Sequence, residues 1–178
     1  AGDARAMCAA MEDHSQSVAP GTVVLVGAGP GDPGLLTVAA RDALLAADVI
    51  IHDGLVDPRI LDLAPATPRV SVAKARSRHT MAQEAINDLL VAEARRGKRV
   101  VRLKGGDPFI FGRGGEEAEA CRAAGVDCRI IPGISAALGG AAQAMIPLTH
   151  RAASSAVSFV AGQCKGLSEQ DWSGLAGK

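Results

Sequence analysis

The chain contains no tyrosine and few other aromatic side chains, with only three phenylalanines and one tryptophan in 178 residues. Proteins that bind single-stranded nucleic acid stack bases on aromatic rings, so this scarcity argues against an RNA partner. Charge argues the same way, because 19 basic residues balance 19 acidic ones and leave no overall field to attract nucleic acid or anionic lipid. Any anionic partner must therefore be bound by a local cluster of cations.

Patterns typical of disulfide scaffolds, metal sites, signal peptides and membrane spans are also missing. The four cysteines, Cys8, Cys121, Cys128 and Cys164, show neither CxxC nor Cys/His spacing, which indicates buried thiols in a reducing compartment and no bound metal. The N-terminus has no basic region followed by an apolar run. Residues 130–149 carry no formal charge, but prolines and glycines interrupt them, so they predict a loop, a helix and a second loop. We expect a soluble, cytoplasmic protein.

Short apolar runs alternate with helical segments along most of the chain. The predicted strands cover residues 22–26, 49–51, 70–72, 99–103 and 126–131. The predicted helices cover residues 35–47, 80–96, 116–124 and 135–144. This alternation predicts an α/β fold with a parallel, five-stranded, doubly wound sheet.

Two further expectations concern boundaries. Thr80 and Gln83 have the spacing of a capping box, so the second helix is expected to begin at Thr80. A sixth strand is expected to start within residues 156–161. We therefore divide the chain into a mobile leader (1–20), an α/β domain (21–150) and the linker and first strand of an incomplete second domain (151–178).

The segment 27–33, Gly-Ala-Gly-Pro-Gly-Asp-Pro, directly follows the first predicted strand. Its spacing is similar to the GxGxxG loop that binds dinucleotides, but Asp32 takes the place of the third glycine. Asp32 would repel a pyrophosphate, and Pro30 has no backbone N–H to offer one. The segment is therefore either a tight turn without a ligand or a loop that a ligand other than a phosphate approaches closely.

The most specialised segment is 102–117, RLKGGDPFIFGRGGEE, which holds five glycines. It begins in a predicted strand and continues past its carboxyl end, where open α/β sheets bind their ligands. Gly105 and Gly106 would let a ligand approach the main chain without a Cβ in the way. Phe109 and Phe111 either pack against a ligand or fill a domain interface. A plain turn would not need this density of special residues.

Taken in order, GAGPGDPGLLT at 27–37, HDGLV at 52–56, the segment 102–117, IPGISAA at 131–137 and IPLTHR at 146–151 resemble uroporphyrinogen III C-methyltransferase. The resemblance implies S-adenosylmethionine-dependent methylation of uroporphyrinogen III to precorrin-2, via precorrin-1, in sirohaem and cobalamin biosynthesis. It also implies two α/β domains with the methyl donor between them, and a homodimer would suit the family. Family members continue beyond the length of this chain, so we expect it to hold only the start of the second domain.

The resemblance also assigns roles to residues. It implies a general base at Asp53 and a proton donor at Lys74. The donor-binding positions that it implies are Pro30, Gly105, Gly106, Asp107, Ile110, Ser135 and Ala136. Because the tetrapyrrole is rich in carboxylates, the candidates for binding it are the cations Arg76, Arg78, Arg102, Lys104, Arg113 and Arg151.

The chain departs from the family pattern at two places. Residues 73–75 read Ala-Lys-Ala where the family shows Gly-Lys-Arg, so one substrate-facing cation is lost unless Arg76 or Arg78 replaces it. Gln143 stands in place of tyrosine, and Met145 stands in place of glycine and is expected to narrow the space there. Two alternatives therefore stay open: a donor- or tetrapyrrole-binding module without turnover, and a methylase of another corrinoid intermediate.

Overall fold

The computed structural model describes residues 19–73 and 81–161. Contacts divide the chain into two units, Ala1–Ile146 and Pro147–Lys178, and the sheet lies in the first. Nearly all of the expected leader, 1–20, and most of the expected second-domain segment lie outside the described residues. The fold described below is therefore that of the first unit.

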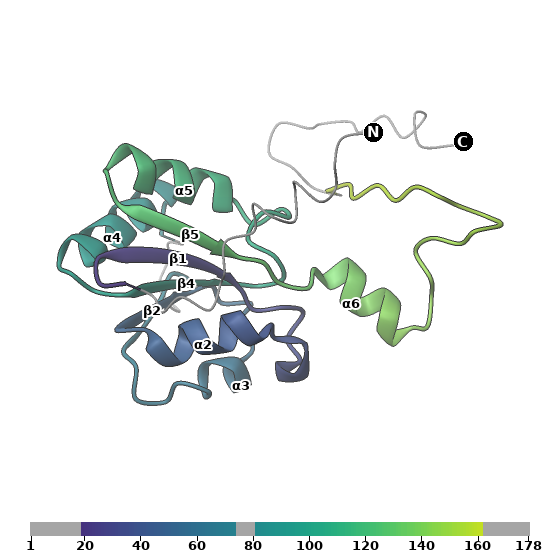
Figure 1. Cartoon of the computed structure of the whole chain (residues 1–178), viewed down its shortest axis with the longest axis horizontal. Coiled ribbons are helices and arrows are strands. Elements are labelled where there is room, and N and C mark those ends of the chain that lie inside the picture. The colour runs from purple at the N-terminus through teal and green to yellow at the C-terminus, as the bar shows by residue number, and fades with distance from the viewer. Residues whose placement is uncertain (1–18, 74–80, 162–178) are drawn as a thin grey trace. The chain divides into compact units, whose positions relative to one another are not determined.

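Five parallel strands form one sheet in the order β3-β2-β4-β1-β5 (Figure 1). The strands are β1 (Thr22–Gly27), β2 (Val49–His52), β3 (Arg69–Ser71), β4 (Val100–Lys104) and β5 (Asp127–Ile131). The helices are η1 (Pro33–Leu35), α2 (Val38–Ala46), α3 (Pro58–Leu61), α4 (Gln83–Arg95), α5 (Gly114–Ala123) and α6 (Ala136–Gln143). The predicted five-stranded parallel sheet is confirmed, whereas the short η1 and α3 carry too little periodicity to be predicted.

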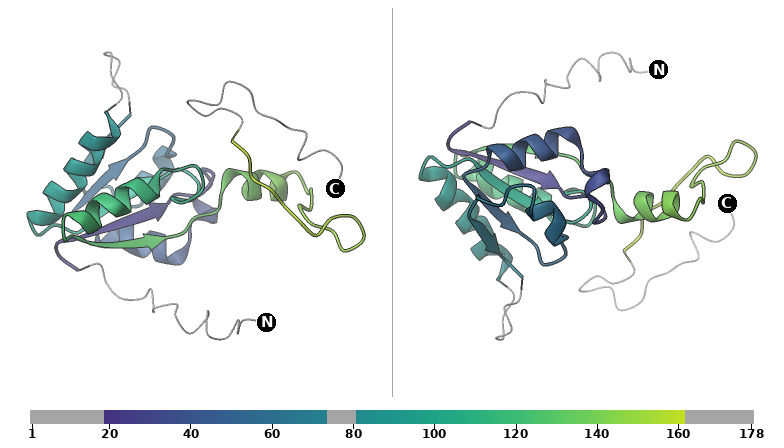
Figure 2. Two further views of the ribbon diagram at one scale, coloured as in Figure 1. Left: turned by 90° about the horizontal axis from the view of Figure 1, so that it is seen from above. Right: turned by 90° about the horizontal axis from the view of Figure 1, so that it is seen from below.

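Helices cover both faces of the sheet, with α2 and α3 on one face and α4 and α5 on the other (Figures 1 and 2). Successive side chains of a strand point to opposite faces, so β1 contributes to two cores. Val24 and Val26 pack in the core beneath α2 and α3, whereas Val23 and Leu25 pack in the core beneath α4 and α5. All of β1 is buried, as expected for a strand covered on both faces.

The chain leaves the neighbouring strands β1 and β4 toward opposite faces of the sheet. After β1 it continues into η1 and α2, and after β4 it continues into α5 on the other face (Figure 1). Such a reversal is a topological switch point, the place where open α/β sheets bind ligands. The carboxyl ends of β1 and β4 are therefore where a functional site is expected.

Two predicted boundaries are wrong. Helix α4 begins at Gln83 rather than at Thr80, which lies outside the described residues, and its N-cap, Ala82, makes no capping bond from its side chain. The Gln83 amide Nε2 instead donates to Asn87 Oδ1 (3.0 Å) and to Glu117 Oε1 (3.4 Å), so a tertiary contact replaces the capping box. Residues 156–161, where a further strand was expected, form no strand and join no sheet in the part of the chain that the structure describes.

The uncharged stretch 130–149 forms the end of β5, a loop and α6, as its prolines and glycines predict. Within residues 19–73 and 81–161, no helix is long and apolar enough to cross a membrane. Cys121 lies buried in α5 and Cys128 lies half-buried in β5, both as free thiols. Cys8 and Cys164 lie outside the described residues.

Candidate functional site

Glycine backbones bring together the loops that follow β1, β4 and β5. Gly29 N donates to Gly106 O (3.1 Å), and Gly106 N donates to Gly29 O (2.8 Å). A Cβ added to Gly27 would lie 2.7 Å from Gly106 O, and one added to Gly133 would lie 2.7 Å from Gly27 Cα. Real side chains do not approach backbone so closely, so glycine is required at 27 and 133 for the loops to meet. We call Gly27, Gly29, Gly106 and Gly133 the glycine junction.

The predicted donor-binding loop, Gly105–Asp107, adjoins this junction and is half-buried. Gly106 has φ +66°, which favours glycine whatever the ligand. Gly105 is different, because a Cβ added there would meet only the Leu55 side chain, at an ordinary contact distance of 3.6 Å. The fold itself therefore does not require glycine at 105.

The Asp107 carboxylate ties this loop to its neighbours. Its Oδ1 accepts a hydrogen bond from Phe109 N (2.8 Å), and its Oδ2 accepts one from Gly133 N (3.0 Å). The second bond joins the β4 loop to the β5 loop. The Asp107 side chain therefore helps to hold the loops of the glycine junction together.

The other predicted donor-binding positions lie on the same edge of the sheet. Ser135 is buried, and its hydroxyl has no hydrogen-bond partner among the described residues. Its Cα would lie 3.7 Å from a Cβ added to Gly106. Pro30 is exposed and packs against α6, since a Cβ added to Gly139 would lie 2.7 Å from the Pro30 Cγ atom. Ala136 and Ile110 are exposed beside them.

The segment between Asp107 and α5 holds two residues in an unfavourable backbone conformation. Phe111 (φ +52°) and Arg113 (φ +57°) adopt the left-handed region, which residues other than glycine rarely occupy. Gly114 N donates to Pro108 O (3.0 Å) and closes this tight loop. Phe109 and Phe111 are 55% and 64% exposed. Strained backbone and exposed aromatic rings of this kind gather at functional sites.

A cluster of four charged side chains lies beneath the same edge, on the α5 face of the sheet. Arg102 and Lys104, two residues apart on β4, both reach Glu117 Oε1, from Nε at 2.9 Å and from Nζ at 3.0 Å. Arg102 Nη2 also donates to Asp53 Oδ1 (2.5 Å), and Lys104 Nζ lies 3.8 Å from Asp53 Oδ2. We call these four residues the charged cluster; its two cations and two carboxylates balance.

Burial separates Asp53 from the rest of the charged cluster. The side chains of Arg102, Lys104 and Glu117 are at most 3% exposed, whereas that of Asp53 is 31% exposed. Asp53 directly follows β2, and its backbone N donates to Leu103 O (3.3 Å), so the predicted base lies at the carboxyl edge. Asp53 is the member of the cluster that can meet a ligand.

The expectation that Arg102 and Lys104 bind substrate carboxylates is revised, because both are buried and neutralised by carboxylates of their own chain. Sequence reasoning also missed Glu117, which it only placed within the predicted helix 116–124. The available signal was the pair of cations two residues apart on a buried strand. Such a pair points to one face and needs a buried acid opposite it.

The remaining predicted cations are placed as follows. Arg113 is exposed and forms a two-point ion pair with Glu116, with Nε–Oε1 at 2.8 Å and Nη2–Oε2 at 2.6 Å. The hydrogen bonds from Arg113 hold the pKa of Glu116 below its usual range. Arg151 is exposed in the second unit. The predicted proton donor Lys74 and the predicted cations Arg76 and Arg78 lie outside the described residues.

Met145 follows the C-terminal cap of α6, Ala144, in a backbone conformation that favours glycine. Its N–H donates to Ala142 O (3.0 Å), and Ile146 N donates to Ala141 O (2.9 Å), which together form a Schellman motif. Met145 has φ +55° and is 90% exposed. Replacing glycine here therefore has a cost in backbone strain, whereas the narrowing of space expected at Met145 stays a prediction.

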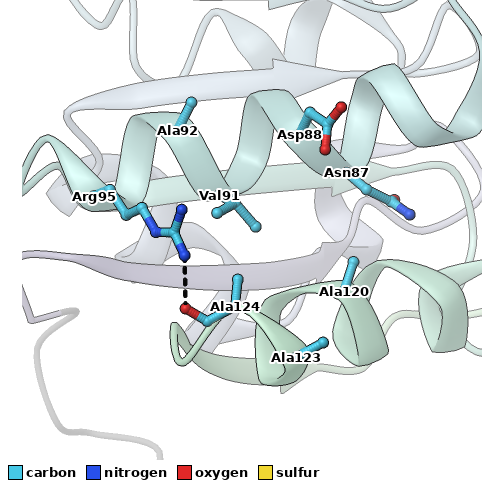
Figure 3. Close-up of a pocket in the computed structure, with 8 residues that line it drawn as sticks. All are labelled: Asn87, Asp88, Val91, Ala92, Arg95, Ala120, Ala123 and Ala124. Carbon is cyan, nitrogen blue, oxygen red and sulfur yellow. Dashed lines mark hydrogen bonds between the residues drawn. The ribbon is translucent and has the colours of Figure 1, made fainter.

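A groove between α4 and α5 lies apart from this edge (Figure 3). Arg95 Nη2 closes one end of it by donating to Ala124 O (3.0 Å), near the C-terminal ends of both helices. The groove is lined by Asn87, Asp88, Val91, Ala92, Arg95, Ala120, Ala123 and Ala124.

In the part of the chain that the structure describes, no three His, Cys, Asp or Glu side chains gather to hold a metal ion. The candidate site is the carboxyl edge of the sheet, because the switch point lies there.

Comparisons with known proteins identify the family of the chain. The family described as Tetrapyrrole (Corrin/Porphyrin) Methylases matches residues 22–178. A siroheme synthase of Nitrosospira multiformis is 54% identical over 168 residues, which are 93% of this chain and 36% of that protein. The chain thus spans about a third of the length of this curated relative.

Solved structures give the same result. A crystal structure of uroporphyrin-III C-methyltransferase from Thermus thermophilus matches with a TM-score of 0.66 and 48% identity, covering 73% of this chain and 55% of that one. A structure of the Thermus thermophilus enzyme complexed with S-adenyl homocysteine matches with a TM-score of 0.62 and 47% identity, covering 73% and 54%. Sequence and fold agree: the chain belongs to the tetrapyrrole methylase family.

Proposed function

We propose that the chain is the donor-binding and base-bearing part of an S-adenosylmethionine-dependent C-methyltransferase. Its acceptor is uroporphyrinogen III, and its product is precorrin-2, formed via precorrin-1 on the route to sirohaem and cobalamin. One observation carries the proposal: the described donor-binding positions and Asp53 share the carboxyl edge of the sheet, at its switch point. Family membership and the relatives' names support the choice of acceptor.

The residues at this edge suit the methyl donor. S-adenosylmethionine is a cation, which backbone carbonyls and a carboxylate accommodate better than the N–H groups of a phosphate-binding loop. Gly105 leaves main chain accessible, and the buried Ser135 hydroxyl still has a hydrogen bond to offer. When bound, the donor supplies a methyl group on a positively charged sulfur, and the glycine junction excludes water by closing one side of its site.

Asp53 is the base in this proposal. Attack by a pyrrole carbon on the methyl group leaves a proton to be removed from the ring, and a positioned base typically contributes about 10²- to 10⁴-fold. Arg102 fixes the Asp53 carboxylate, which is exposed enough to meet the ring. Lys74 is proposed as proton donor. Arg76, Arg78, Arg113 and Arg151 are proposed to bind the carboxylates of the tetrapyrrole.

Calorimetry with S-adenosylhomocysteine on the 178-residue chain tests donor binding. We expect binding that Gly105→Val weakens at least about tenfold, because a side chain there occupies the ligand's place. Gly115→Val is the matched control: a Cβ added to Gly115 meets nothing within 4 Å, and Gly115 lies in α5 outside the donor-binding positions. Equal affinity of both variants would contradict the placement of the donor.

Turnover is measured separately, as transfer of a labelled methyl group to uroporphyrinogen III. Asp53→Asn should lower the rate by about 10²- to 10⁴-fold while donor binding stays intact. Donor binding without any turnover would favour the binding module, and methylation of a different corrinoid would favour the other alternative. If the folded chain shows neither donor binding nor turnover, the proposal is overturned.

A further inference from the structure

Glu117 is the least accessible member of the charged cluster. Its side chain is fully buried, and one of its carboxylate oxygens, Oε2, has no hydrogen-bond partner among the described residues. The other oxygen, Oε1, accepts from Arg102, Lys104 and Gln83. Burying a carboxylate is costly, and hydrophobic side chains of similar volume often serve stability as well as a buried ion pair does. A role beyond stability therefore has to be considered.

Arg102 connects Glu117 rigidly to Asp53. Its Nε donates to Glu117, its Nη1 lies 3.4 Å from the carbonyl oxygens of Ile51 and Leu103, and its Nη2 donates to Asp53. All three guanidinium nitrogens are thus held, and the group is planar, so its orientation is fixed. Because Glu117 holds the buried end of this plane, it also determines where the other end places the Asp53 carboxylate.

Charge connects the same residues. From β4, Arg102 and Lys104 face Asp53, and Glu117 on α5 lies behind both of them. The ring nitrogen Nδ1 of His52, the preceding residue, contacts the Asp53 carbonyl oxygen at 3.0 Å. Without Glu117, two buried cations would face the single carboxylate of Asp53. Charges interact strongly where water is excluded, so the ionised form of Asp53 would then be over-stabilised.

We propose that Glu117 is a positioning residue for Asp53: it aims the carboxylate through Arg102 and offsets the charge of Arg102 and Lys104, so that Asp53 can accept a proton. This inference rests on the proposed function, in which Asp53 is the base. It assigns Glu117 no contact with the substrate. It also explains why β4 carries cations at two buried positions that an aliphatic core would otherwise fill.

The test is the titration of Asp53, followed by carbon-detected NMR of the aspartate carboxyl groups in the full 178-residue chain and assigned with Asp53→Asn. In Glu117→Gln the titration midpoint of Asp53 should fall by about one pH unit or more, because an uncompensated cation favours the carboxylate. In Lys104→Met it should rise, because one cation is removed. Glu119→Gln, an exposed acid on the same helix, is the matched control and should leave the midpoint unchanged.

An unchanged midpoint in folded Glu117→Gln would overturn the inference. If Glu117→Gln does not fold, Lys104→Met decides. The inference is then overturned if the titration midpoint of Asp53 does not rise in Lys104→Met. The titration needs neither donor nor tetrapyrrole. Its result can therefore contradict the role of Glu117 while methyl transfer is observed, or support that role while no methyl transfer is observed. Where turnover is measurable, Glu117→Gln should move the acidic limb of the pH–rate profile to lower pH, whereas a purely structural role would lower the rate equally at every pH.

Discussion

Two regions at the carboxyl edge of the sheet are built in opposite ways. The four residues of the glycine junction have no side chains, and three loops meet there through close backbone contacts that the Asp107 carboxylate reinforces. The charged cluster consists of long side chains with their charges buried beneath the same edge. Both regions draw on one stretch of chain, because Arg102 and Lys104 belong to the cluster and Gly106 belongs to the junction.

The two regions therefore respond to different changes. The junction depends on the volume of its residues, which neither pH nor salt alters. The cluster depends on charge balance, so the loss of one member exposes the others to an uncompensated charge. The stretch 102–107 thus combines a sterically fixed surface for a ligand with an electrostatically fixed carboxylate. A substitution that leaves one region intact should reveal the contribution of the other.

The largest effect is expected in the charged cluster. Arg102→Met should lower the free energy of unfolding by about 3–5 kcal/mol, because it leaves the carboxylate of Glu117 buried with one fewer cation. Urea denaturation near neutral pH measures this loss. Arg113→Met removes an exposed ion pair from the same segment and should cost less than about 1 kcal/mol. Similar losses in the two variants would show that burial does not set the two pairs apart.

The sequence predicted much of this edge because strand ends and turn residues follow local rules. The alternation of apolar runs with helices was enough to predict the parallel sheet, and the sheet places the ends of β1, β2, β4 and β5 along one edge. Glycine-rich segments after β1 and β4 predicted loops where a ligand is approached. These are statements about the backbone, and local sequence determines the backbone well.

The charged cluster could not be predicted in the same way. Asp53 and Arg102 are 49 residues apart in the chain, and Glu117 reaches Lys104 only because α5 packs over β4. Which cation is buried and which is exposed depends on this packing, so Arg102 and Arg113 were both predicted to bind carboxylates of the tetrapyrrole. Gln83 shows the same limit, since a contact with Glu117 replaces the capping box that local spacing predicted.

A smaller effect is expected in the glycine junction. Gly133→Ala should lower the free energy of unfolding by about 1–3 kcal/mol, because the new methyl group meets the backbone of Gly27 and Gly106, which cannot yield as a side chain can. Gly140→Ala is the matched control, since a Cβ there meets nothing within 4 Å and helix α6 should gain about 0.5–1 kcal/mol. A change of the same sign in both variants would contradict the steric account.

The smallest effect is expected at the opposite, amino-terminal edge of the sheet, where Asp48 and Arg99 form an ion pair that solvent reaches. Arg99 donates to the Asp48 carboxylate from Nε (3.0 Å), from Nη2 (2.7 Å) and from its backbone N (2.8 Å). These hydrogen bonds lower the pKa of Asp48 from 3.8 to about 2. Because both side chains are more than a third exposed, Asp48→Asn should cost less than about 1 kcal/mol near neutral pH.

The pH dependence of this cost tests its origin. The pKa of Asp48 is lower in the folded chain than in the unfolded one, so the pair stabilises the fold fully above about pH 4 and loses this contribution as the pH falls toward 2. The difference in unfolding free energy between wild type and Asp48→Asn should therefore shrink between about pH 6 and pH 3 in urea denaturation. Asp42→Asn, which breaks a more exposed pair with Arg41, should show a smaller difference at both pH values. If Asp48→Asn instead cost as much as Arg102→Met, charge alone would matter at both edges of the sheet, and burial would not explain the charged cluster.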